Sequence, residues 1–241
     1  MRTIRKLFIT VFTVLSFAML TPLSTVDAQP APLVQQGDRF WYEYEPGKLN
    51  HCTIGYVDAA RRTIMFTGHC TTLPNAKVFA SNPDGSPGVE MGNVTLNHYR
   101  GTPHSDMAIA NINHNVNIGG NIYSGDKWVM PHQVMPGDRV CSRGANSNAV
   151  HCGFSLGWEA PNLVQATRNA GGIPGDSGGP AWVPGKGFIG MYSGYTNART
   201  FWTYPDMSYG KIDISILKKN AENAINSAIH DFRLPITPVK L

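Results

Sequence analysis

Gly175-Asp176-Ser177-Gly178-Gly179-Pro180 is the stretch of this sequence that restricts the fold and the chemistry most. Glycines on both sides of Ser177 leave its hydroxyl accessible and let backbone N–H groups converge on one point. Such a turn can present a nucleophile and an oxyanion hole together. A serine hydroxyl is a weak nucleophile by itself, so it needs a positioned base, and that base needs a carboxylate to orient it.

Two segments upstream of Ser177 contain residues of these types. His69 lies in Phe66-Thr67-Gly68-His69-Cys70, at the end of an apolar run. Asp106 lies in Ser105-Asp106-Met107-Ala108-Ile109-Ala110, directly before another such run. An acid in that position is expected to be partly buried, where it must be hydrogen-bonded or paired. The chain therefore has candidates for a base, an orienting acid and a nucleophile, in the order His, Asp, Ser.

The rest of the chain reads as short strands separated by turns. Among 241 residues, 25 are Gly and 17 are Pro, while only 15% are charged, which argues against coiled coils and long solvated helices. Apolar runs of strand length alternate with turn signals from Phe40 to Ile214. A 3–4 spacing of apolar residues predicts one helix, over about 214–232. These patterns predict an all-β domain with a C-terminal α-helix.

Residues 1–28 are typical of a cleaved signal peptide. A basic start precedes a 14-residue apolar run, Leu7 to Leu20, which is short for a membrane span, and Val26-Asp27-Ala28 then suits signal peptidase. Without residues 1–28, the chain has 17 Lys and Arg against 15 Asp and Glu. This nearly neutral balance gives no support for nucleic-acid binding. We expect a secreted, extracellular domain over 29–241, with no stable membrane anchor after signal removal.

Cysteine usage fits an exported protein. The four cysteines are Cys52, Cys70, Cys141 and Cys152. An even number in an oxidising compartment predicts two disulfides, and three pairings are open. His51, His69 and His151 each precede a cysteine, but zinc sites usually have two cysteines two to four residues apart, and this sequence has no such pair. We therefore expect disulfides and no metal.

Taken together, these motifs resemble those of the chymotrypsin-like serine proteases. The nearer likeness is to their bacterial secreted branch, the streptogrisin and alpha-lytic protease type. Gly175 to Pro180 carries the most specific part of the resemblance, which extends from about Cys52 to the predicted helix. The resemblance implies two packed six-stranded antiparallel β-barrels, over about 35–118 and 119–213, with the active site in the cleft between them.

The resemblance also implies the disulfide pairing. The region from Cys52 to Cys70 resembles the disulfide region of that branch's first barrel, and the region around Cys141 and Cys152 resembles a disulfide loop of alpha-lytic protease. Sequential pairing, Cys52–Cys70 and Cys141–Cys152, follows. A third disulfide of the family is missing, because Gly171 replaces the cysteine that usually precedes the serine hexapeptide.

In this family pattern, His69 is the general base, Asp106 orients it and Ser177 is the nucleophile. The backbone N–H groups of Gly175 and Ser177 would form the oxyanion hole. The resemblance thus implies a secreted serine endopeptidase that hydrolyses peptide bonds through an acyl-enzyme. It would need no cofactor and would act as a monomer on peptide or protein substrates.

Specificity follows from four implied substrate-binding residues, Gly171, Ser193, Gly194 and Tyr195. Gly171 occupies the pocket floor, where trypsin has an acid, and Ser193 begins the strand that pairs with the substrate. Tyr195 replaces a glycine of the pocket wall. A bulky wall without the acid predicts a preference for small or medium apolar side chains. If Asp206 reaches the back of the pocket, basic side chains are expected instead.

A buried ion pair is expected at Asp176. In animal family members a new N-terminus, freed by cleavage, pairs with the acid before the serine, but no activation sequence of that type precedes Cys52. The bacterial branch uses an arginine just after the cysteine equivalent to Cys141. Arg143 is the nearest candidate partner of Asp176 and Arg139 the second. With such a partner the enzyme would be active without zymogen cleavage.

The hexapeptide is also compatible with two other readings. Its Gly-x-Ser-x-Gly pattern matches the nucleophile elbow of α/β-hydrolases, but that fold needs its acid and histidine after the serine, and His230 is the only later histidine. A catalytically silent homologue that works as an extracellular binding protein would keep the fold without the activity. Since every triad position is filled, the sequence favours the enzyme.

Overall fold

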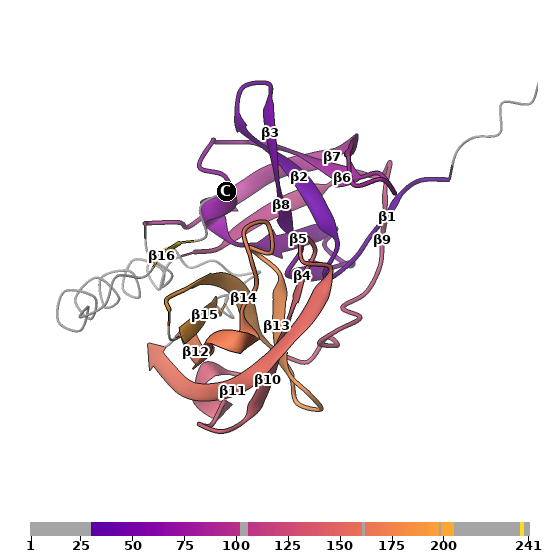
Figure 1. Cartoon of the computed structure of the whole chain (residues 1–241). Helices are drawn as coiled ribbons and strands as arrows, with labels where there is room; N and C mark the ends of the chain where they lie inside the picture. The colour runs from indigo at the N-terminus through magenta and orange to yellow at the C-terminus, as the bar shows by residue number, and fades with distance from the viewer. Residues whose placement is uncertain (1–29, 102–105, 161, 198, 205–236, 239–241) are drawn as a thin grey trace, which may run out of the picture. The chain divides into compact units, whose positions relative to one another are not determined.

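The computed structural model describes residues 30–101, 106–160, 162–197, 199–204 and 237–238. The predicted signal peptide, the predicted helix over 214–232, Asp206 and His230 lie outside these residues. None of the helices in the described part is long and apolar enough to cross a membrane. Regular structure there is almost entirely β-strand, and Figure 1 shows the strands in two groups. The all-β prediction is confirmed.

Seven strands form the first sheet, in the order β3-β2-β6-β7-β8-β5-β4, and all neighbours are antiparallel. They are β2 (Arg39–Glu45), β3 (Lys48–Thr53), β4 (Tyr56–Asp58), β5 (Thr63–Phe66), β6 (Lys77–Ser81), β7 (Pro87–Asn97) and β8 (Ala108–Ile112). Outside this sheet, β1 (Leu33–Val34) and β9 (Asn117–Ile118) form a short parallel pair.

The second sheet closes on itself. Its strands are β10 (Arg139–Gly144), β11 (Ala149–Ala160), β12 (Leu163–Thr167), β13 (Pro180–Val183), β14 (Gly187–Tyr195) and β15 (Arg199–Thr203). They follow the order β13-β10-β11-β12-β15-β14, and β14 pairs back to β13. A seventh strand, β16 (Thr237–Pro238), adds to β14. Short 3-10 turns span Gly68–Cys70, Pro131–Gln133 and Arg168–Ala170.

The predicted two-barrel architecture is confirmed, with one difference in the first sheet. The described pairings leave that sheet open, because β3 and β4 are its two edges and do not pair with each other. At the end of β3 and directly after it the backbone bonds elsewhere: the N–H of Thr53 donates to Ser177 at 2.8 Å, and the N–H of Ile54 donates to Asp38 at 2.9 Å. The bond from Thr53 links the end of β3 to the turn that contains Ser177.

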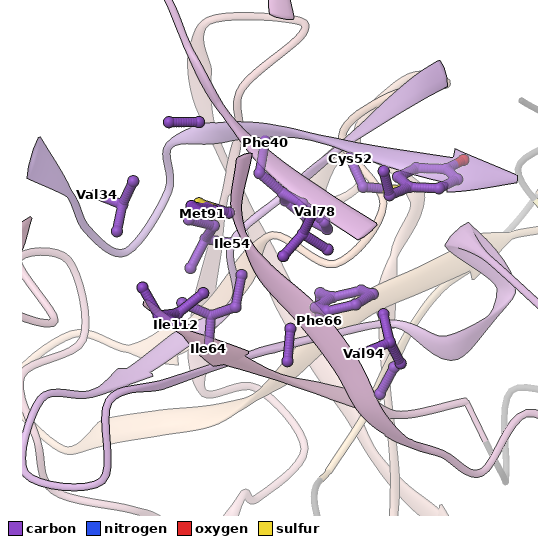
Figure 2. Packing of buried hydrophobic residues seen from close by; sticks show 14 of the residues in the cluster. Val34, Phe40, Cys52, Ile54, Ile64, Phe66, Val78, Met91, Val94 and Ile112 are labelled. Atoms are coloured by element: carbon purple, nitrogen blue, oxygen red, sulfur yellow. The ribbon is translucent and has the colours of Figure 1, made fainter. Parts of the chain in front are cut away.

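Alternation of apolar residues builds the core of the first sheet. In β2, Phe40 and Tyr42 are fully buried, while Trp41 between them is partly exposed. Burial of such side chains is the main favourable term in folding. Figure 2 shows the labelled members of this core directed toward one another, among them Phe40, Ile54, Ile64, Phe66 and Val78. The second sheet encloses its own core, with Trp202 the largest fully buried side chain.

A smaller apolar cluster joins the two sheets. Its buried members are Tyr56, Met65, Met107, Ile109, Phe188 and Met191. The first four come from the first sheet or its flank, and the last two lie on β14. The sheets approach so closely here that a Cβ on Gly55 would lie 2.3 Å from the carbonyl oxygen of Gly178 and 2.5 Å from Cγ of Met191. This apolar cluster between the sheets, called the seam below, therefore lies beside the turn that contains Ser177.

Two disulfides fix the segments that flank the seam. The structure joins Cys52 to Cys70 and Cys141 to Cys152, which is the pairing implied by the resemblance. The first ties β3 to the turn that carries His69, and the second links directly paired residues of β10 and β11. Each closes a short loop and should contribute about 3 kcal/mol on the chain-entropy model.

Candidate active site

His69 and Asp106 are brought together by β5 and β8, which are neighbours in the first sheet. Nδ1 of His69 lies 2.7 Å from Oδ2 of Asp106, and the backbone N–H of His69 donates to Oδ1 at 2.8 Å. The two side chains are only 6% and 1% exposed. The carboxylate therefore holds both the backbone and the ring of His69, so that Nε2 is the ring nitrogen left for another partner.

Glycine is required at position 68 because a side chain there would collide with neighbouring residues. A Cβ at this position would lie 2.6 Å from Oδ1 of Asn97 and 2.9 Å from Cβ of Tyr99. The Tyr99 ring lies 6.0 Å from the His69 ring, centroid to centroid. Burial raises the pKa of the Tyr99 hydroxyl, and the charge of Asp106 raises it further, so this phenol stays neutral beside the imidazole. The glycine thus lets the β7 side of the sheet close over the histidine turn.

Ser193 links Asp106 to the second sheet. It lies on β14, is buried, and its hydroxyl donates to Oδ2 of Asp106. The carboxylate thereby accepts hydrogen bonds from the backbone N–H of His69 and from the Ser193 hydroxyl, in addition to its contact with the imidazole. A buried carboxylate requires this degree of satisfaction. One acid therefore connects a residue of the first sheet with a residue of the second.

The backbone conformation of the nucleophile turn, Gly175 to Pro180, favours glycine at two positions. Gly175 and Gly178 have φ angles of +88° and +83°, in the left-handed region that favours glycine. Bonds to Tyr192 of β14 fix the turn: the N–H of Gly178 donates to the Tyr192 carbonyl at 2.9 Å, and the N–H of Tyr192 donates to Gly179 at 2.8 Å. These bonds hold Ser177 in the turn before β13, beside the seam.

The reactive atoms of Ser177 and His69 have no partners. Ser177 is completely buried, and among the described residues neither its Oγ nor Nε2 of His69 makes a hydrogen bond. The two atoms are therefore not hydrogen-bonded to each other. In the same part of the chain the N–H groups of Gly175 and Ser177 donate no hydrogen bond, whereas the N–H of Asp176 between them donates to Ile173 at 3.0 Å. The unpaired groups are those that the predicted chemistry would use.

Asp176 is held by backbone amides and not by an arginine. Its Oδ1 accepts from the N–H groups of Asn146 at 2.9 Å and Ser147 at 2.8 Å, and its Oδ2 accepts from Ile173 at 3.0 Å. His151 is the nearest ionisable partner, with Nε2 4.0 Å from Oδ2. In the described part of the chain no arginine lies within 4.0 Å of this carboxylate.

The predicted ion pair of Asp176 with Arg143 or Arg139 is therefore not formed. Strand alternation explains why: a Cβ on Gly144 would lie 2.1 Å from Cγ of Asp176, so position 144 faces the carboxylate and position 143 faces away. The Arg143 guanidinium instead donates to the carbonyl of Gly144 at 2.8 Å and to Asn148 at 2.7 Å.

Arg168 is a residue that the sequence reasoning missed. Its guanidinium stacks on the Tyr195 ring, 3.9 Å from the centroid, and donates to the Gly172 carbonyl at 3.4 Å. A Cβ on Gly171 would lie 2.4 Å from Oγ1 of Thr200 and 3.1 Å from Nη1 of Arg168. Two predicted substrate-binding positions, 171 and 195, thus meet around a cation. The available signal was an arginine nine residues before Ser177 in a chain with few charges.

No grouping of three or more His, Cys, Asp or Glu side chains that could hold a metal ion occurs in the described ranges. The site therefore consists of a buried histidine–aspartate pair, a buried serine in a glycine turn, and the β14 strand that connects them. The arrangement can supply a base, a nucleophile and two backbone donors without a metal ligand set.

Comparisons with known proteins show the fold. No family model and no curated protein sequence matches the chain. A glutamic acid specific serine protease of solved structure superposes with a TM-score of 0.52 at 17% identity, covering 79% of this chain and 98% of its own. The inactivated protease paralogue S-I1 of the scabies mite gives a TM-score of 0.51 at 14% identity, covering 76% and 96%. This chain has the chymotrypsin-like fold of serine proteases, and the streptogrisin branch stays a prediction.

Proposed function

We propose that this chain is a secreted serine endopeptidase in which Ser177 is the nucleophile, His69 the general base and Asp106 the acid that orients it. The observation that supports this most is the buried His69–Asp106 pair, together with the unpartnered Nε2 and Oγ atoms. Buried polar atoms are nearly always hydrogen-bonded. Other buried atoms of the described residues, such as the Tyr42 hydroxyl and Nε1 of Trp202, also lack partners, so it is the presence of a base and a nucleophile in one site, and not the missing partners alone, that supports groups kept for a substrate.

The proposed reaction has two halves. Oγ of Ser177 attacks the peptide carbonyl carbon while its proton moves to Nε2 of His69, and the N–H groups of Gly175 and Ser177 stabilise the oxyanion. Breaking the C–N bond returns the proton to the leaving amine and leaves an acyl-enzyme. Water then attacks the ester with His69 again as base, which releases the acid product and restores Ser177. No cofactor enters either half.

Secretion is proposed on two grounds, the sequence of residues 1–28 and the two disulfides. Disulfides persist in oxidising compartments and are rare in the cytosol. The substrates would be peptides or proteins, acted on by a monomer. The Arg168 guanidinium beside Tyr195 would repel a basic side chain bound there, so we do not expect a preference for lysine or arginine.

The test is covalent labelling of the mature protein with a fluorophosphonate probe. Wild-type protein should be labelled at Ser177, and Ser177→Ala should abolish labelling while a Ser86→Ala control, in the turn between β6 and β7, keeps it. Acidification should slow labelling, because a protonated imidazole cannot act as base.

The second candidate function is a catalytically silent homologue that acts as an extracellular binding protein. One observation favours it: Ser177 and His69 do not hydrogen-bond to each other, and Ser177 is completely buried. A folded wild-type protein that stays unlabelled after every attempt to open the site would establish this reading and exclude the enzyme.

A further inference from the structure

Strand β16 pairs with the same edge of β14 that bonds to the nucleophile turn. β15 covers one edge of β14 as far as Tyr195. The other edge pairs first with β13 and then, at Tyr192, with Gly178 and Gly179 of the nucleophile turn. Beyond Tyr192 this second edge has no neighbour from β13, and there β16 pairs with it. The C-terminal segment is therefore the next strand along the edge that holds Ser177 in place.

The register sets the direction in which β16 runs. Thr237 is opposite Tyr195 and Pro238 is opposite Gly194, in an antiparallel pair. The segment therefore runs from Tyr195 toward Ser193, whose hydroxyl bonds to Asp106. An extended peptide in this position approaches the nucleophile turn with its carboxyl end. Addition of an extended peptide to a sheet edge is a common mode of peptide binding, in which main-chain hydrogen bonds supply affinity.

Burial of the reactive groups is a second, separate observation. Ser177 is 0% exposed, and the side chain of His69 is 6% exposed. A substrate carbonyl must come within bonding distance of Oγ, so some part of the chain must move before any peptide can react. The structure is thus of a closed site, with one strand of the same chain paired on the edge that leads to it.

We propose that the chain's own Thr237-Pro238 segment occupies the β14 edge from Ser193 to Tyr195, where the family resemblance implies that substrate pairs, and acts there as an internal competitor of substrate. The site opens when this segment leaves the edge. Competition with substrate rests on the proposed function, whereas docking of the segment does not require catalysis. A segment that occupies the edge nine-tenths of the time leaves about one-tenth of the molecules competent, which raises KM about tenfold and leaves kcat unchanged.

A pair of full-length variants tests the competition. Thr237 has the only N–H group of β16, since proline has none. Thr237→Pro removes that donor, and Thr237→Val is the matched control, because it keeps the N–H and the branched shape. We expect Thr237→Pro to lower KM for a peptide substrate about tenfold at unchanged kcat, with active sites counted by fluorophosphonate titration. Thr237→Val should behave like wild type. Equal KM values in all three proteins would overturn the proposal, as would a change confined to kcat.

Binding without catalysis separates this inference from the proposed function. Two Ser177→Ala proteins are compared, one full-length and one without residues 237–241, and the probe is a fluorescent peptide with the sequence of residues 236–241. At an effective concentration on the order of 1 mM for the tethered segment, nine-tenths occupancy corresponds to a Kd of about 0.1 mM for the free peptide. The shortened protein should bind the peptide at about this Kd, and the full-length protein about tenfold more weakly.

The two experiments distinguish failure of the proposed docking from failure of the proposed function. If no variant reacts with fluorophosphonate but the shortened protein binds the peptide, the proposed function fails and the docking stands. If the shortened protein folds and does not bind the peptide, the docking is refuted. Should either C-terminal change prevent folding, hydrogen exchange on wild-type protein decides: the Thr237 amide should be protected in the free protein and exposed after a peptidyl inhibitor binds, and rapid exchange in the free protein refutes the proposal.

Discussion

Replacing Asp176 by alanine should be one of the most destabilising single changes near the site. The carboxylate is 1% exposed and accepts hydrogen bonds from three backbone N–H groups, those of Asn146, Ser147 and Ile173, at 2.8–3.0 Å. Each donor left unsatisfied costs roughly 1–3 kcal/mol. For three such donors we expect a loss of about 3–5 kcal/mol in the free energy of unfolding, near the lower end of the summed cost.

Arg143→Gln is the matched comparison, because it removes the charge that the sequence assigned to Asp176. Its guanidinium contacts only Gly144, Asn148 and the Tyr123 ring among the residues described, so the loss should be about 1 kcal/mol or less. The assay is urea denaturation at neutral pH with the disulfides intact, which requires equal slopes for the variants compared. If Arg143→Gln lowers the free energy of unfolding as much as Asp176→Ala, stabilisation of Asp176 by backbone amides is refuted, and Arg143 must be its partner.

Three further results are expected. Ser193→Ala should lower kcat/KM roughly 10- to 100-fold, because Asp106 loses a hydrogen bond to a charged group that contributes about 1.5–3 kcal/mol; steady-state kinetics on titrated active sites checks this, and an unchanged value contradicts it. Burial raises the pKa of Asp38 from 3.8 to about 6, although the Gln35 N–H and the Arg143 charge lower it. The folded state therefore favours the protonated carboxyl. The stabilisation that this proton gives is complete below about pH 4 and is lost as the pH rises through 6. Relative to Asp38→Asn, wild-type protein should therefore lose up to about 3 kcal/mol between pH 4 and pH 7.5 in urea titrations, and a constant difference would exclude the effect. Replacing Cys141 and Cys152 by serine should cost about 3 kcal/mol, measured as a lower urea midpoint, while reduction of that variant's remaining disulfide should lower the midpoint again.

Local sequence patterns predicted much of the fold, because short strands and turns depend mainly on residues that are close together in the sequence. The disulfide pairing and the positions of His69 and Asp106 followed from a family resemblance, and the structure brings those two side chains to 2.7 Å. The open first sheet was not predictable. It depends on Thr53 and Ile54 bonding to Ser177 and Asp38, and no periodicity in the sequence reports contacts of this kind.

The partner of Asp176 shows a sharper limit. In the bacterial branch that the sequence resembles, the arginine directly follows the cysteine. In this chain that position is Ser142, whose buried hydroxyl donates to the Ala170 carbonyl at 2.6 Å. Arg143 is one residue later, and a shift of one residue along a strand turns a side chain to the other face. Arg143 is therefore only one residue from the expected position, but its side chain lies on the face of the strand that points away from Asp176. Arg168 and β16 were missed for a related reason, since their contacts with Tyr195 join segments far apart in the sequence.

The apolar seam between the two sheets has a consequence for how this protein would age in an oxidising environment. Three of its six buried members, Met65, Met107 and Met191, carry thioethers. Conversion of a thioether to the sulfoxide places a polar oxygen among apolar groups and disrupts their packing. A Cβ on Gly55 would lie 2.5 Å from Cγ and 2.9 Å from Sδ of Met191, so this part of the seam has no space for an added atom. Peroxide damage would thus part the histidine and serine halves of the site while every polar residue in it stayed chemically intact.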